Sequence, residues 1–406
     1  MKSKHAIIYT FQSLEDPLVK GLILEYLKTY KEPGQEFVFH LITHEQEEFK
    51  LSSEDVVGKV ADLQKLNIKW YPINYKSGSF LILKKIYNFI QTFFIALRIK
   101  RKYKPVAIMG FLSIAGGYSY ILSKILNLKL IVYCFEPHSE YMIDFNIWKK
   151  SSLKYKLLRK FEFLQIKNAE YIVVPNNHTK LLVEKFSSNN NLLICPISIS
   201  TDAMTFDSVA RKKIRKSLHA ENKTIVIYTG KFGGIYYSTD QVIEFYTKLY
   251  KENKNLFFYI ITPNLSEVKN SISKYNLPTD CFYVSLTVNY SELNQHVSAA
   301  DIGFVALPSL PSQKYRTPVK TAIYLSCGVP YIVNKGIGED DFIANEKKVG
   351  IVIDNLTEDS SSVISKMNTL FSGDLNQLHQ LCRNEAINTR SIASAHSVLN
   401  KIFSKL

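Results

Sequence analysis

Residues 317–341 read TPVKTAIYLSCGVPYIVNKGIGEDD, and this segment decides the fold class of the second half of the chain. Pro318 suits a helix start, where its missing N–H is harmless, and Gly328 suits the position just after a helix C-terminus. The apolar run that follows, YIVN, is typical of a buried strand. The segment therefore predicts a helix, a tight turn and a buried strand of an α/β unit.

The same alternation of helical and strand patterns extends over the 406 residues. In the first half we expect strands at 5–10, 36–43, 68–73, 105–110, 128–135, 171–175 and 192–197. The helical patterns between them cover 17–30, 54–66, 80–103, 115–127, 151–167 and 178–186. After a polar, basic connection, a second strand series is expected at 224–230, 256–262, 281–286, 301–307, 329–334 and 349–354. Such alternation predicts two α/β domains with parallel sheets and a boundary near residues 196–222.

Composition excludes several classes of protein. Hydrophobic residues make up 46% and charged residues 21%, which is typical of a globular chain. The five cysteines form no CxxC pair and no zinc spacing, so we expect neither a disulfide framework nor a structural zinc site. The first apolar run is too short for a secretory signal, and the uncharged stretch 105–123 is interrupted by glycines. We therefore expect no membrane span and a cytoplasmic protein.

The net charge of +15 is unevenly distributed. Residues 1–200 hold 28 lysines and arginines against 17 acids, and no acid occurs between Asp62 and Glu136. Such a field attracts nucleic acid, phosphorylated substrates or an acidic membrane surface, although a soluble basic protein has the same composition.

The helix expected after Pro318 offers a candidate anion site. Free amides at its start, the helix dipole and the cations Arg316 and Lys320 converge there. An ordinary helix–strand unit with solvated cations fits the same spacing.

A glycine-rich turn follows the expected strand 224–230. Gly230, Gly233 and Gly234 lack Cβ atoms, so the backbone can approach a ligand closely, and Lys231 could meet a diphosphate. A tight structural turn has the same signature.

Two clusters of polar residues follow other strands. Glu136 and His138 lie just after the strand 128–135, where they could take or orient a proton from a hydroxyl. Glu339 and Asp340 follow the strand 329–334 and could bind sugar hydroxyls. The alternatives are a loop whose polar groups bond to one another and acids that cap the next helix.

The segment 317–341 resembles the nucleotide-sugar region of family 4 glycosyltransferases, enzymes of the GT-B fold. The residues that match the family run are Pro318, Lys320, Tyr324, Leu325, Gly328 and Pro330. The resemblance covers residues 190–355 well and the first half loosely. It implies two Rossmann-like domains facing across a cleft, a nucleotide-sugar donor and transfer with retention. It also implies no cofactor and no metal, because the nucleotide sugar is a substrate.

The resemblance assigns roles to the candidate residues. Lys231, Arg316 and Lys320 would hold the donor diphosphate with the glycine loop, and Tyr324 would lie at the donor site. His138 would contact the donor sugar. The departures are Tyr315 and Ile323, which stand where the family usually has glutamates, and Tyr237, which stands where it has a second cation.

The resemblance also implies a division of labour. Residues 1–200 would form the acceptor-binding domain, 201–386 the nucleotide-sugar domain and 387–406 a helix packing back on the first domain. The expected function is sugar transfer to a glycan or lipid-linked acceptor, in surface polysaccharide assembly. The alternatives are a nucleotide-sugar epimerase and a non-catalytic relative that binds glycan or a protein partner. We expect no nucleic-acid partner, because no recognised nucleic-acid module is present.

Two basic runs with aromatic residues, 76–104 and 148–160, suggest a further partner. They could lie as amphipathic helices on an anionic membrane, at the inner face of the plasma membrane. They could equally bury their aromatic stripes and solvate their lysines.

Overall fold

The computed structural model describes residues 3–28, 30, 37–75, 81–134 and 136–406, apart from the side chains of Leu81 and Ile82. Lys76, Phe80 and Phe135, which belong to the patterns above, lie outside the described residues. The chain divides into two compact units. The first comprises Met1–Pro196 and Ile392–Leu406, and the second comprises Ile197–Ser391.

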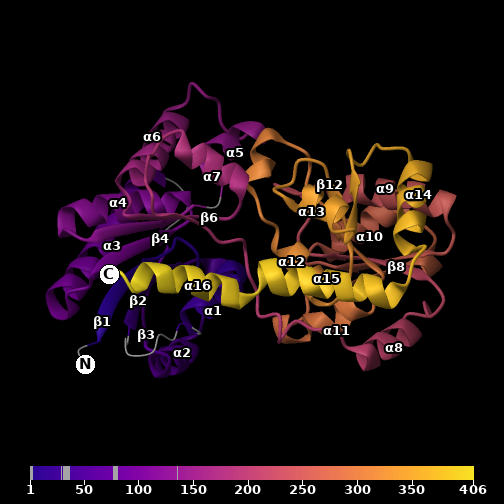
Figure 1. Cartoon of the computed structure of the whole chain (residues 1–406), viewed down its shortest axis with the longest axis horizontal. Coiled ribbons are helices and arrows are strands. Elements are labelled where there is room, and N and C mark those ends of the chain that lie inside the picture. The colour runs from indigo at the N-terminus through magenta and orange to yellow at the C-terminus, as the bar shows by residue number, and fades with distance from the viewer. Residues whose placement is uncertain (1–2, 29, 31–36, 76–80, 135) are drawn as a thin grey trace. The chain divides into compact units, whose positions relative to one another are not determined.

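The first unit is a parallel α/β sheet with helices on its faces (Figure 1). Its strands are β1 Lys4–Tyr9, β2 Phe37–Glu45, β3 Ile68–Asn74, β4 Ala107–Phe111, β5 Lys129–Tyr133, β6 Tyr171–Val174 and β7 Leu192–Ile194. Its helices are α1 Leu24–Lys28, α2 Ser53–Lys65, α3 Leu81–Tyr103, α4 Ser113–Leu126, α5 His138–Asp144, α6 Leu153–Asn168, α7 Asn177–Glu184 and α16 Ile392–Phe403. A π-helical turn, Val19–Ile23, leads into α1.

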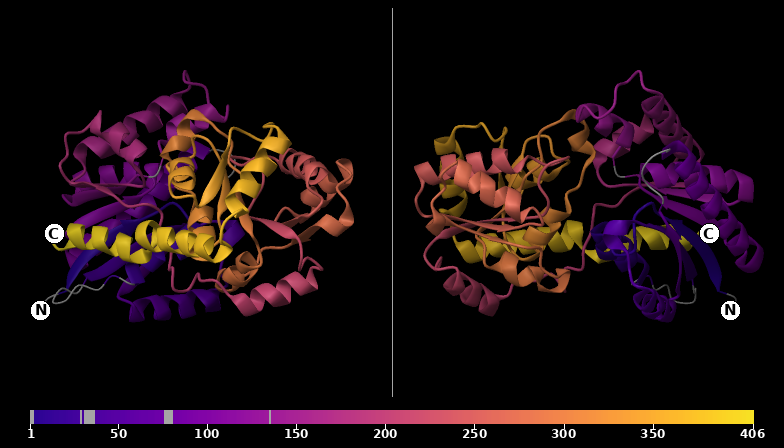
Figure 2. Two further views of the ribbon diagram at one scale, coloured as in Figure 1. Left: turned by 45° about the vertical axis from the view of Figure 1, so that its right-hand side comes forward. Right: turned by 180° about the vertical axis from the view of Figure 1, so that it is seen from behind.

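Within the described residues the first sheet has seven parallel strands in the order β3-β2-β1-β4-β5-β6-β7. The central strands are buried along most of their length, as expected for a parallel sheet covered on both faces. On one side, α16 runs beside α1 (Figures 1 and 2). Phe403 of α16 packs on Tyr30, Phe37 and Phe39, with ring centroids 5.0–5.6 Å apart. These aromatic contacts attach the last helix to the first unit.

A buried polar network crosses strands β1 and β2 of the first unit. His44 Nε2 lies 3.0 Å from the Tyr9 hydroxyl and 3.2 Å from Thr92 Oγ1 of α3. His40 contacts His5 at 3.1 Å and the Tyr71 hydroxyl at 3.0 Å. Burial lowers the pKa of His40 to about 3 and that of His44 to about 4. Both imidazoles are therefore neutral in the folded protein near pH 7.

The second unit repeats the α/β arrangement. Its strands are β8 Thr224–Thr229, β9 Leu256–Ile261, β10 Phe282–Ser285, β11 Ile302–Val305, β12 Tyr331–Asn334 and β13 Gly350–Ile353. Its helices are α8 Ser208–Ser217, α9 Thr239–Glu252, α10 Leu265–Lys274, α11 Leu293–Ser298, α12 Val319–Ser326, α13 Asp340–Glu346, α14 Ser360–Phe371 and α15 Leu375–Arg390. All strand pairs given for this sheet are parallel, in the order β10-β9-β8-β11-β12-β13.

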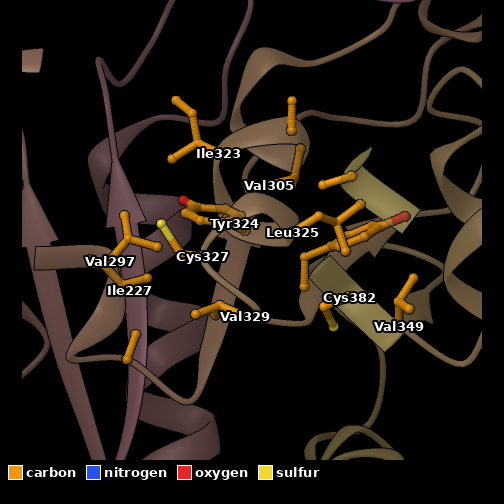
Figure 3. Packing of buried hydrophobic residues seen from close by; sticks show 14 of the residues in the cluster. Ile227, Val297, Val305, Ile323, Tyr324, Leu325, Cys327, Val329, Val349 and Cys382 are labelled. Carbon is orange, nitrogen blue, oxygen red and sulfur yellow. The ribbon is translucent and has the colours of Figure 1, made fainter. Parts of the chain in front are cut away.

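Helix α12 is buried against the second sheet (Figure 3). It begins after Pro318 and ends at Ser326 with Cys327 as its C-cap, and Gly328 follows as the sequence predicted, with φ +69°. Tyr324 is fully buried over β11, where a Cβ added at Gly303 would lie 2.3 Å from its ring. Only a glycine at position 303 therefore lets α12 approach the sheet this closely.

The connection into the second unit is more ordered than the sequence indicated. The basic segment expected as a polar linker contains helix α8, capped by Asp207, whose side chain accepts from the amides of Val209 and Ala210. Two arginines of α8 reach Asp301 at the start of β11: Arg211 at 2.5 Å and Arg215 at 3.0 Å. Ile214 and Leu218, at its end, also pack against the core of the second unit, so both charge pairing and apolar contacts hold this helix.

The two ends of the second unit meet. The Ile199 amide donates to the Arg390 carbonyl at 2.8 Å, and Ile199 forms an isolated parallel bridge with Ser391. The helix expected at the C-terminus is interrupted here, because α15 ends at Arg390 and α16 begins at Ile392. The second unit thus starts and finishes side by side.

The fold class predicted from the sequence, two parallel-sheet α/β domains, is confirmed. The uncharged stretch 105–123 forms β4 and the start of α4, and none of the described helices has the length and apolar character of a membrane span. The segment after β5, considered as a loop, instead forms the short helix α5.

Acid should destabilise the first unit through its buried histidines. Because the unfolded chain protonates histidine below about pH 6.5 and folded His44 does not until about pH 4, the free energy of unfolding should fall by about 3 kcal/mol over that window. Both tryptophans, Trp70 and Trp148, belong to the first unit, so tryptophan fluorescence during denaturant unfolding reports it selectively.

A His44→Gln variant should reduce this pH dependence without abolishing it, because the amide can still bond to Tyr9 and Thr92 but does not titrate, while His40 remains. His219, an exposed histidine of the second unit, provides the matched control as His219→Asn. An unchanged acid slope in His44→Gln would rule out the buried imidazole as its cause.

Candidate active site

The glycine-rich loop between β8 and α9 is a tight turn, which is one of the two interpretations that the sequence left open. Gly230, Gly233 and Gly234 all have positive φ, at +131°, +74° and +63°. The Gly233 amide donates to the Tyr237 carbonyl at 2.9 Å, which closes the loop. Helix α9 then starts with a capping box formed by Ser238 and Gln241. The turn is therefore well defined, and its shape depends on glycine.

Lys320, in the first turn of α12, lies in an aromatic cage. Its Nζ is 4.6 Å from the ring centroid of Tyr228, the penultimate residue of β8, and 4.0 Å from that of Tyr236 in the loop. The ammonium also donates to the Tyr228 hydroxyl at 3.3 Å. The faces of aromatic rings attract cations without neutralising their charge. The cage therefore contacts the ammonium of Lys320 without pairing it with a carboxylate.

Gly230 completes this cage. A Cβ added at Gly230 would lie 2.8 Å from Lys320 Cε and 3.0 Å from Nζ. The sequence predicted that a ligand would approach the backbone closely at Gly230. In the structure the side chain of Lys320 occupies this space. No ion pair is found for Lys320 within the described part of the chain.

Burial, with the charge of Arg316 as the second cause, lowers the pKa of Lys320 to about 7. Arg316 follows a 3-10 turn, Pro311–Tyr315, and its amide donates to the Gln313 carbonyl at 3.0 Å. The two cations are close enough to repel each other, so an anion bound near both would relieve this repulsion. This electrostatic arrangement favours a phosphate or diphosphate ligand.

Lys231 is connected to the cage through its backbone. The Tyr228 hydroxyl donates to the Lys231 carbonyl, and Tyr228 stacks on Phe232 with centroids 4.4 Å apart. The Lys231 side chain is exposed. The structure thus brings together Gly230, Lys231 and Lys320, and Arg316 acts on Lys320 electrostatically.

The positions where the resemblance expects other groups are filled by apolar or aromatic residues. Ile323 is 5% exposed and packs in the core cluster of Figure 3. Tyr237 is buried, and its hydroxyl accepts from Asn334 Nδ2 at 2.6 Å. Tyr315 is half-buried, with the Lys314 ammonium 5.2 Å from its ring centroid.

Tyr324, which was expected at the donor site, is fully buried. It donates to the Phe304 carbonyl at 3.3 Å, and burial raises its pKa to about 12. Its hydroxyl is therefore neutral and serves packing.

Asp340 has buried partners of its own. Its carboxylate accepts from Thr321 Oγ1 of α12 at 2.6 Å and pairs with Arg390 of α15. Burial raises the pKa of Asp340, against the lowering effect of Arg390. Asp340 therefore connects α13 to α12 and α15. These contacts account for its burial, and no ligand is needed to explain it. Glu339, at the N-cap of α13, is half-buried, and its contact with a sugar stays a prediction.

Glu136 and His138 lie in the first unit. His138 is the first residue of α5, and Glu136 lies two residues before it. The Glu136 carbonyl accepts from Ser113 Oγ at 2.9 Å. The His138 ring stacks on Tyr141 at 5.5 Å and meets Trp148 edge-on at 6.2 Å. These aromatic neighbours orient the imidazole.

A buried carboxylate supports the first turn of α5. Glu162 of α6 accepts from the Ser139 amide at 3.0 Å and from Ser139 Oγ at 2.5 Å. Burial raises the pKa of Glu162, while Arg159, 3.6 Å away, opposes this. Glu162 therefore caps the helix that carries His138, a contact that no motif in the sequence announced.

The aromatic cage was also missed from the sequence. Tyr228 is 92 positions before Lys320, and the apolar strand pattern gives no sign that its ring holds a cation. The described residues contain no group of three His, Cys, Asp or Glu side chains arranged to hold a metal.

Residues 310–386 match the family described as "Glucosyltransferase 3-like, C-terminal domain". This match contains Arg316, Lys320 and Glu339 of the candidate site. No curated protein matches the chain.

Solved structures match over the whole chain. A sucrose-phosphate synthase from Thermosynechococcus elongatus has a TM-score of 0.72 at 12% identity, covering 99% of this chain and 98% of its own. Anabaena HepE, solved with UDP and glucose, has a TM-score of 0.71 at 12% identity, covering 100% of both chains. A glycosyltransferase from Rickettsia africae has a TM-score of 0.70 at 13% identity, covering 100% and 99%. The chain therefore has the GT-B glycosyltransferase fold.

Replacing Gly230 by alanine should disrupt the cage. The left-handed backbone is strained for alanine, and the new Cβ would meet Lys320, so we expect the free energy of unfolding to fall by ~1–3 kcal/mol. Urea unfolding followed by circular dichroism measures this loss.

Gly233→Ala is the matched control, because it has a positive φ but no atom within 4 Å of the added Cβ. Its loss should be smaller. Equal losses in the two variants would show that contact with Lys320 does not matter.

Proposed function

We propose that the protein is a glycosyltransferase that moves a sugar from a nucleotide-sugar donor to a glycan or lipid-linked acceptor, with retention, in surface polysaccharide assembly. The observation that carries this proposal is the caged, buried Lys320 against Gly230, at the junction of β8 and α12. A cation placed without a carboxylate partner is suited to receive an anionic group. The GT-B fold and the match at 310–386 support a sugar nucleotide as that group.

The chain's own residues would stabilise the leaving group. As the bond between sugar and diphosphate breaks, negative charge develops on the diphosphate, and Lys320, Arg316 and Lys231 would offset it. Three cations supply this role without a bound metal, so the proposed reaction uses no cofactor. The acceptor hydroxyl would attack on the face from which the diphosphate leaves.

The acceptor role is proposed for the first unit. His138, fixed by Tyr141 and Trp148, would orient a hydroxyl or accept its proton, with Glu136 as the alternative base. Glu162 would act as a positioning residue through the first turn of α5.

A uridine diphosphate donor is the first to test. Anabaena HepE was solved with UDP and with UDP-glucose, and it shares the fold at low identity. Calorimetry against a panel of nucleoside diphosphates and their sugars would identify the preferred base. Transfer then requires an acceptor, whereas an epimerase would release an altered nucleotide sugar without one.

One observation favours a non-catalytic relative as the second candidate. Ile323 and Tyr315 replace both glutamates that the resemblance places at the donor. A binding protein would bind nucleotide or glycan in the calorimetric panel and show no turnover of the nucleotide sugar. Location in the cytoplasm, at the inner face of the plasma membrane, belongs to the main proposal.

Donor binding should depend on pH through Lys320. Its pKa of about 7 in the free site would rise on contact with a diphosphate, so binding takes up a proton above pH 7. Affinity should therefore fall as pH rises from 7 to 9, by up to about tenfold per unit. Calorimetry of UDP in buffers with different ionisation enthalpies measures the proton uptake directly.

A Lys320→Met variant should lose ~1.5–3 kcal/mol of UDP binding together with the proton uptake. Lys231→Ala, which removes an exposed cation, should lose less affinity and retain the uptake. Unchanged affinity in Lys320→Met would remove this lysine from the donor site.

The apolar residue at position 323 should weaken recognition of the ribose. In an Ile323→Glu variant, the new carboxylate can accept from the ribose hydroxyls, so the ratio of UDP to 2′-deoxy-UDP affinity should rise several-fold over the wild type. The two nucleotides are compared in the same variant, because burying a carboxylate also costs stability. If the variant is folded and the ratio does not rise, position 323 does not face the ribose.

A further inference from the structure

Helix α3 has its large apolar residues on the outside. Leu83, Ile86, Ile90 and Phe94 are 64%, 51%, 44% and 61% exposed, and Tyr87 is 42% exposed. Their spacing places them on one face over more than three turns of the helix. This exposed face is called the α3 stripe below.

The opposite face of α3 packs inward with small and polar side chains. Asn88, Thr92, Ala96 and Ile99 are fully buried. Thr92 Oγ1 donates to the Asn88 carbonyl at 2.9 Å and lies 3.2 Å from His44 Nε2. Phe89 and Phe93 add partly buried rings to this inner side. The residues of the stripe are nevertheless left outside, so α3 presents a large apolar face that the first unit does not cover.

The surroundings of the stripe are basic. Beyond Phe94, the exposed side chains of the helix are Arg98, Arg101 and Lys102. The sequence has no acid from residue 63 to residue 135. The partner of the stripe must therefore be apolar and also carry negative charge.

Helix α6 extends this surface. Burial and then the charge of Lys154 lower the pKa of Lys85, which places the start of α6 near the start of α3. Leu153 and Leu157 of α6 are 75% and 52% exposed. Helices α3, α4 and α6 lie together on one side of the first unit (Figure 1). Several helices therefore contribute apolar side chains and lysines to this side.

We propose that the α3 stripe, with the start of α6, docks the first unit on the surface of an anionic lipid bilayer. Leu83, Ile90 and Phe94 would enter the acyl boundary, while Arg98, Arg101 and Lys154 would meet lipid phosphates. A lipid surface matches a row of exposed apolar side chains bordered by cations. This inference concerns a different surface from the donor site and does not depend on it.

The aromatic residues of this helix divide between two roles. Phe89 and Phe93 are half-buried and pack against the core of the first unit, whereas Tyr87 and Phe94 are exposed. The expectation of a buried aromatic stripe therefore holds for one pair and not for the other.

Vesicle binding tests the proposal with the full chain. The wild type should co-sediment with vesicles of phosphatidylcholine containing 30% phosphatidylglycerol, and at least tenfold less with phosphatidylcholine alone. Binding should fall in 1 M salt, where the Debye length is about 3 Å. An Ile90→Ser/Phe94→Ser variant should bind at least ~30-fold less, because two inserted side chains are lost.

A matched control changes exposed apolar residues of the second unit. Val209→Ser/Leu375→Ser replaces side chains that are 75% and 50% exposed and should bind vesicles like the wild type. A second measurement uses brominated lipid, which should quench Phe94→Trp more than Leu375→Trp after subtraction of the wild-type signal.

Three outcomes would overturn the proposal. They are equal binding to neutral and anionic vesicles, equal loss in the control and stripe variants, and absent quenching at position 94. Light scattering addresses the other occupant: a dimer that the stripe variant dissociates, without vesicle binding by the wild type, would assign the stripe to a second copy of the chain.

Discussion

The packing of helix α12 on the sheet of the second unit depends on the contact between Tyr324 and Gly303. The tyrosine ring occupies the space where any other residue at 303 would have its side chain, so α12 lies directly on β11. This close packing fixes the first turn of α12 and thereby the position of Lys320. It also fixes Thr321, whose hydroxyl connects to Asp340 and Arg390. Packing inside the unit therefore sets the geometry of its charged groups.

The surroundings of Lys320 determine its protonation state. A carboxylate partner would neutralise the ammonium and keep it protonated at all ordinary pH values. Two tyrosine rings instead stabilise the cation weakly while excluding water, and the neighbouring Arg316 opposes its charge. The result is a lysine with a pKa near 7, which is the property that the proposed proton uptake on donor binding depends on.

The sequence predicted the features that depend on local chemistry. Apolar runs predicted the positions of the strands along the chain, and Pro318 and Gly328 predicted the limits of α12. The glycines predicted a turn after β8. Contacts between distant segments could not be read in this way. The cage joins residues about 90 positions apart, and Asp340 meets Arg390 50 positions away.

Helix α3 shows a different limit of sequence reasoning. Periodicity identifies which of its residues share a face, but both faces carry apolar groups, so it does not tell which face is buried. One contact that distinguishes the inner face is the one between Thr92 and His44 of β2, which lie far apart in the sequence. Periodicity along α3 carries no information about such a partner.

The bridge between Ile199 and Ser391 has an evolutionary consequence. The second unit is one uninterrupted segment whose first and last residues are neighbours, inserted before the final helix of the first unit. A segment with adjoining ends can be exchanged between genes as a cassette, because the recipient needs only to accommodate two neighbouring junctions. Recombination at these junctions would combine a new second unit with an existing first unit, and would leave Phe403 and its aromatic partners in place.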